Sequence, residues 1–83
     1  MKELKKQEYE ILYYISIGRN SIERLEGLFD KKDILKVISK LDKNGLIKIS
    51  IREGEIYGFM ETSKGKEILT DLDYREWYIE LGD

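Results

Sequence analysis

The spacing of apolar residues changes at Gly45, and this change limits the fold more than any other feature of the chain. In the preceding segment, DKKDILKVISKLDKNG, a helical period is carried by Ile34, Val37, Ile38 and Leu41. In the following segment, LIKISIREGEIYGFME, apolar and polar residues alternate around Glu53-Gly54, which is typical of a β-hairpin. The sequence therefore predicts an amphipathic helix that leads directly into a hairpin, and a fold of the α+β class.

The predicted turn at Glu53-Gly54 sets a register for the hairpin. A two-residue loop pairs Ile51 with Ile56, Ile49 with Gly58 and Ile47 with Met60, and we expect this face to cover the helices. The opposite face would carry Lys48, Ser50, Arg52, Glu55, Tyr57 and Phe59. In this register, an aromatic side chain at Phe59 is unexpected on the mixed face unless another element packs over it.

Two further helices are predicted before the hairpin. A stripe of Leu4, Ile11, Leu12 and Ile15 indicates a helix from about Lys5 to Ile17. A short helix follows, capped by Asn20 or Ser21 and ending near Phe29, with one apolar face formed by Ile22, Leu25, Leu28 and Phe29. We expect the Asp30 carboxylate to cap the next helix, and Asn44-Gly45 to end it.

The segment after the hairpin predicts a last helix, capped by Thr62 or Ser63. Its apolar residues include Ile68, Leu69 and Leu72. Asp73 and Glu76 have the spacing of a capping box, so residues 73–83 either continue this helix or form a separate one.

Positive charge is concentrated on one side of the helix that precedes Gly45. The chain has a net charge of −2, yet six lysines lie between Lys31 and Lys48 against only Asp33 and Asp42. The side opposite the apolar stripe carries Lys32, Lys36, Ser39, Lys40 and Lys43. Such a face suits an anionic partner such as DNA, although lysines on a surface helix also serve solubility alone.

A second apolar surface is predicted at the two ends of the chain. Tyr9, Tyr13 and Ile17 form a stripe on the far side of the first helix, and the acidic tail turns Tyr74, Trp77, Tyr78 and Leu81 to one side. Because these residues have no evident core to enter, we expect them to form a homodimer interface. The alternative for the tyrosines is an ordinary surface position with the hydroxyls in water.

Composition argues against an enzyme. The chain has no His and no Cys, so the usual general bases, zinc ligands and thiol nucleophiles are missing, and we expect neither a metal site nor a cofactor. The charged N-terminus and the lack of a long apolar run predict neither a signal peptide nor a membrane span, hence a cytoplasmic protein. Heavy use of Lys, Glu and Ile resembles hyperthermophile proteins, as in an archaeal or archaeal-virus source.

The order of predicted elements resembles the winged helix-turn-helix fold of small MarR, PadR and ArsR-like transcription regulators. The segment ILKVISKLDKNGLIKIS is similar to a recognition helix that runs into a strand, and YGFMETSKGKEIL is similar to the segment that leaves the wing. The resemblance implies one domain over residues 1–83. Its parts would be an N-terminal helix (1–20), a helix-turn-helix (21–45), a wing (46–61) and a C-terminal dimerisation helix (62–83).

The resemblance also implies a function, namely sequence-specific binding of double-stranded DNA by a homodimeric regulator. Helix 31–44 would enter the major groove, and the implied DNA-binding residues are Lys31, Lys32, Lys36, Ser39, Lys40, Lys43 and Arg52. Two departures from the family pattern favour a competing function. The outward helix face has no Arg, Asn or Gln before Asn44, and Glu53 and Glu55 flank Arg52 at the wing tip. A winged-helix module that binds protein and not DNA is therefore the alternative.

Overall fold

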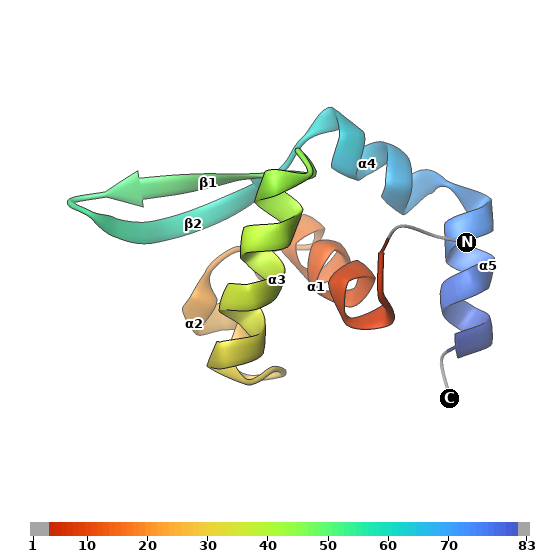
Figure 1. The fold of residues 1–83 in the computed structure, drawn as a ribbon, viewed down its shortest axis with the longest axis horizontal. Helices are drawn as coiled ribbons and strands as arrows, with labels where there is room; N and C mark the ends of the chain where they lie inside the picture. Colours follow the sequence, from red (N-terminus) through yellow and green to blue (C-terminus); the bar gives the residue numbers. More distant parts are fainter. Residues whose placement is uncertain (1–3, 82–83) are drawn as a thin grey trace.

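Helices make up most of the protein, and one antiparallel hairpin projects from them (Figure 1). The computed structural model describes residues 4–81. In chain order, the elements are α1 (Lys6–Ser16), α2 (Ile22–Leu25), α3 (Lys31–Lys43), β1 (Ile47–Arg52), β2 (Glu55–Glu61), α4 (Ser63–Thr70) and α5 (Leu72–Leu81). The α+β prediction is confirmed, and this element order is compatible with a winged helix. The hairpin and α5 extend toward opposite ends of the molecule (Figure 1).

The hydrophobic core lies where α1, α2, α3 and the base of the hairpin meet. Its fully buried side chains are Ile11, Leu12, Leu25, Ile34, Ile38, Leu41, Leu46 and Ile47. The predicted burial of Ile11, Leu12 and Ile15 on α1 is confirmed, and Leu4 is also buried although it precedes the helix; the predicted inner face of α3 is confirmed as well. The amphipathic pattern of α3 thus determines which of its sides is left for a partner.

The hairpin turns at Glu53-Gly54 as predicted. Both residues have positive φ angles, 53° and 80°, as a tight two-residue hairpin turn requires. Next to the turn, Ile51 pairs with Ile56, which confirms the predicted register there.

Farther from the turn, the predicted register is wrong because β2 contains a bulge. Ser50 pairs with Gly58, and Ile49 pairs with Phe59 instead of Gly58. One extra residue on a strand moves every later side chain to the other face. The shift buries Phe59 and leaves Met60 65% exposed, the reverse of the predicted facing.

A backbone contact between β2 and a residue far from it in the sequence accounts for the bulge. The N–H of Phe59 donates to the carbonyl oxygen of Asn20, 2.9 Å away, so the loop before α2 pairs with β2 at one point. A Cβ at Gly58 would lie 3.0 Å from the same oxygen, which makes glycine the residue that best allows this approach. The hairpin is therefore anchored to the helices as well as to its own turn.

The predicted helix caps are confirmed in part. Ser21 caps α2 by accepting a hydrogen bond from the N–H of Arg24. Asn44 is the C-cap residue that follows α3, and the next residue, Gly45, has a φ of 74°. Asp30 occupies the N-cap position of α3, but its carboxylate makes no capping hydrogen bond, so that prediction was wrong. Charge near the helix N-terminus remains favourable without that bond.

The segment 62–70 is held against the end of α3. Thr62 caps α4 by accepting from the N–H of Gly65, and its hydroxyl donates to the carbonyl oxygen of Gly45 at 2.6 Å. Gly65 itself is buried, and a Cβ there would collide with the carbonyl oxygen of Leu46. A close approach of two backbones therefore explains why glycine occupies this position.

The C-terminal segment forms two helices, not one. The chain leaves the helical conformation at Asp71, whose side chain accepts from the N–H of Asp73 at 2.8 Å and so begins α5. The possibility of a separate helix is thus confirmed, but the cap is Asp71 and not the predicted Asp73. The break lets α5 turn back toward α1 (Figure 1).

Candidate functional site

The outward side of α3 is the most distinctive charged surface among the described residues. Its opposite side is locked into the core by four buried aliphatic residues, so the orientation of the helix is fixed. Of the residues predicted to bind DNA on this helix, those that are exposed to solvent are Lys31, Lys32, Lys36, Ser39 and Lys43. None of these lysines has an acidic partner among the ion pairs found in the described part of the chain.

Lys40 departs from this arrangement. Its ammonium group lies 3.0 Å from each carboxylate oxygen of Glu8 on α1. The Glu8 side chain is only 8% exposed, and it also accepts from the backbone N–H of Lys5 at 2.8 Å. Lys40 therefore joins α3 to α1, and its predicted place on the free outward face needs correction.

Leu35 also lies on the outward face, although the sequence predicts no role for it. It is 41% exposed and lies one helical turn from Lys31 and from Ser39. Its position could have been found by continuing the helical period, because Leu35 falls outside the arc of Ile34, Val37, Ile38 and Leu41. One apolar side chain therefore stands among the lysines.

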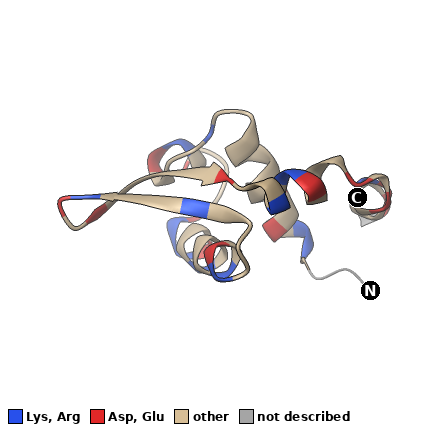
Figure 2. Ribbon diagram, turned by 90° about the horizontal axis from the view of Figure 1, so that it is seen from above, with Lys and Arg blue, Asp and Glu red and all other residues tan. Residues whose placement is uncertain are grey.

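Arg52, predicted to lie at the wing tip, is at the end of β1 and is exposed. Its guanidinium carbon lies 4.6 Å from the centre of the Tyr57 ring, which is a cation–π contact. The next residues, Glu53 and Glu55, place negative charge at the tip, and Figure 2 shows both signs there. The tip therefore offers less positive potential than the outward side of α3.

The aromatic residues predicted to form a dimer interface pack mainly against one another within one chain. The Tyr9 ring of α1 contacts three rings of α5, with centroid distances of 6.0 Å to Tyr74, 6.2 Å to Trp77 and 5.0 Å to Tyr78. Tyr9 and Tyr74 are buried, and the other two rings are half-buried. The reasoning that these residues have no core to enter was wrong, because α1 and α5 provide one.

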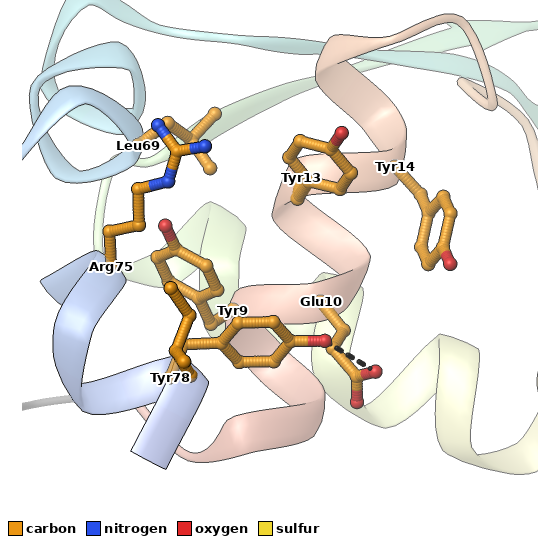
Figure 3. Close-up of a pocket in the computed structure, with 8 residues that line it drawn as sticks. Tyr9, Glu10, Tyr13, Tyr14, Leu69, Arg75 and Tyr78 are labelled. Carbon is orange, nitrogen blue, oxygen red and sulfur yellow. Dashed lines mark hydrogen bonds between the residues drawn. The ribbon is translucent and has the colours of Figure 1, made fainter. Parts of the chain in front are cut away.

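A polar contact completes this junction between α1 and α5. The Tyr78 hydroxyl donates to the Glu10 carboxylate at 2.9 Å (Figure 3). Burial, and then the hydrogen bond to Glu10, raises the pKa of Tyr78 to about 12. Burial also raises the pKa of Tyr9, an effect that the nearby Arg75 guanidinium partly offsets.

A hollow of about 360 Å³ opens beside this aromatic cluster. It lies between α1, α4 and α5, with Tyr13 on one side and Arg75 and Leu69 on the other (Figure 3). Two residues that were predicted to lie in the dimer interface remain exposed: Tyr13 (47%), which lines the hollow, and Ile17 (57%), at the end of α1. Ile79 of α5 (63%) also lines the hollow and is exposed. The side chain of Leu81, also predicted to lie in the interface, is outside the part of the chain that the structure describes.

Other kinds of site find no support within residues 4–81. No group of three or more acidic side chains there is placed to hold a metal ion, and no helix there is both long and apolar enough to cross a membrane. Comparison with known protein families, curated proteins and solved structures finds no match to this chain.

Proposed function

We propose that the protein is a sequence-specific regulator of transcription that binds double-stranded DNA as a homodimer, with α3 in the major groove. The observation that carries this proposal is the outward side of α3, where Lys31, Lys32, Lys36 and Lys43 are exposed around Ser39. A helix with one buried side and one cationic side can lie along a groove that phosphates border on both edges.

Binding of DNA phosphates by α3 requires lysines that acidic side chains of the same chain do not neutralise. Four lysines of each subunit carry no acidic partner within the described residues, so their ammonium groups can replace the counterions of DNA phosphates. Lys40 is removed from the proposed contacts because it pairs with Glu8. Part of the negative charge behind the net charge of −2 lies on α5, at the opposite end of the molecule from the hairpin (Figure 1), and local charge on α3 governs the contact with DNA.

A dimer would place two copies of α3 against one duplex. The proposed interface now consists of the uncovered residues Tyr13, Ile17 and Ile79, because the α5 aromatics are largely covered within one chain. Two recognition helices about 34 Å apart would meet successive turns of the major groove. In sedimentation at micromolar concentration, we expect a dimer for the native chain and a shift toward monomer for Tyr13→Glu/Ile79→Glu. A monomeric native chain would refute this part of the proposal.

The DNA proposal is tested by fluorescence anisotropy with a random-sequence duplex across a salt series. If all four lysines contact phosphates, the slope of log affinity against log salt should be about −3.6 for each subunit, from about −0.9 per phosphate neutralised. Binding that is absent at low salt would contradict the proposal.

A winged-helix module that binds protein is the alternative, and the hairpin favours it. Ile51, Tyr57 and Met60 are each at least 64% exposed, and the adjacent tip carries Glu53 and Glu55. Single exposed apolar residues are common, but three on one hairpin can form a contact with the surface of a protein partner. Under this alternative, substitutions on the hairpin would abolish binding of the protein partner, whereas substitutions of the α3 lysines would leave that binding unchanged.

A further inference from the structure

We infer that Leu35 reads a thymine methyl group in the major groove, and so sets part of the sequence preference. This inference rests on the proposed DNA binding by α3. It assigns a specificity role to a residue that the charge pattern alone leaves without one.

Leu35 lies early in α3, on its outward side. Leu35 is the fifth residue of α3, one turn after Lys31 and one turn before Ser39. Its side chain is 41% exposed, so no element of the described chain covers it fully. In a helix that enters the major groove, residues near the N-terminal end approach the base edges.

The chemistry of the major groove also favours this role for Leu35. Lysine on the same face mainly contacts phosphates or guanine acceptors, and Ser39 can pair with several base edges. The edges that bases present in the major groove are polar except for one apolar group, the C5-methyl of thymine. An aliphatic side chain held in the groove by neighbouring cations therefore has one complementary base.

The test compares duplexes that differ only in that methyl group. Duplexes that the native chain enriches from a random library should contain thymine at a fixed position, and uracil at that position should bind about fourfold more weakly. This factor corresponds to the free energy of burying one methyl group, about 0.8 kcal/mol. Leu35→Ala should bind the thymine and uracil duplexes equally and keep the native dependence on salt.

Two controls separate this effect from general changes. Leu72→Ala, a substitution of a 70% exposed leucine on α5, should retain the fourfold preference for thymine. Uracil placed outside the enriched site should have no effect on affinity. Because Leu35 is exposed, Leu35→Ala should also melt within a few degrees of the native chain, which circular dichroism can verify.

The possible failures are distinguishable. Salt-dependent binding without enrichment of thymine, or with equal affinity for uracil, overturns the role of Leu35 and leaves the proposed function intact. A uracil effect that persists in Leu35→Ala also overturns it, since another group would then contact the methyl. Absence of binding to any duplex at low salt overturns both proposals together.

Discussion

Removing the Lys40 ammonium group should destabilise the fold, whereas removing a neighbouring ammonium on the same helix should not. Lys40→Met keeps most of the aliphatic chain but leaves the Glu8 carboxylate without the cation that lies 3.0 Å from both of its oxygens. Glu8 would retain the 2.8 Å hydrogen bond from the N–H of Lys5. Its side chain is only 8% exposed, so water cannot readily replace the missing partner.

The expected loss can be bounded from these contacts. A hydrogen bond to a charged group contributes about 1.5 to 3 kcal/mol, and an exposed ion pair about 0 to 1 kcal/mol. Lys40 is 40% exposed, so solvent screens the pair in part, and we expect Lys40→Met to lower the free energy of unfolding by about 1 to 2 kcal/mol. Lys36→Met, on the free side of α3, should change it by less than about 0.5 kcal/mol.

Urea denaturation followed by circular dichroism measures both changes. Adding Glu8→Gln to each variant completes a double-mutant cycle, in which Glu8 should couple to Lys40 and not to Lys36. Equal midpoints for Lys40→Met and Lys36→Met would refute the ion pair as a stabilising contact.

Three further outcomes are expected. Leu41→Ala should lower the free energy of unfolding by about 2 to 5 kcal/mol in urea melts, because this fully buried side chain leaves a cavity; a loss under about 1 kcal/mol would mean the helix is rotated. Gly65→Ala should lower the melting temperature or prevent folding, since its Cβ would collide with the Leu46 carbonyl, and an unchanged melt would contradict that packing. The stabilising contribution of neutral Tyr78, hydrogen-bonded to Glu10, should be fully present below pH 10 and disappear as pH rises through about 12, because folding raises its pKa from the ordinary 10.0. Tyr78→Phe should therefore flatten the fall of melting temperature between pH 10 and 12, and an identical fall in both proteins would exclude this linkage.

Local patterns predicted most of the elements because their causes are local. The spacing of Ile34, Val37, Ile38 and Leu41 is enough to orient α3, and the positive φ angles at Glu53-Gly54 follow from a two-residue turn between alternating strands. Four lysines of α3 are exposed for the same reason, since they lie outside the arc of that stripe: Lys31, Lys32, Lys36 and Lys43.

The errors have tertiary causes. The hairpin register depends on a hydrogen bond from Phe59 to Asn20. The spacing of residues within the hairpin cannot predict this contact, because the two residues are 39 positions apart. Lys40 differs from Lys36 only through Glu8, which lies 32 residues away. Likewise, the aromatic rings of α5 pack against Tyr9 because Asp71 interrupts the helix and lets α5 return to α1. A periodic pattern reports which side of an element is apolar, but not which partner covers it.

The most direct test of DNA binding through α3 compares two double variants of equal net charge. Lys32→Gln/Lys36→Gln removes two exposed cations from the outward side of α3, and Lys66→Gln/Arg75→Gln removes two exposed cations from α4 and α5. For duplex DNA, the first variant should reduce the slope of log affinity against log salt by about 1.8 for each bound subunit, at about 0.9 per phosphate contact. The second should retain the native slope. Equal slopes for the two variants would contradict the assignment of the DNA contact to α3.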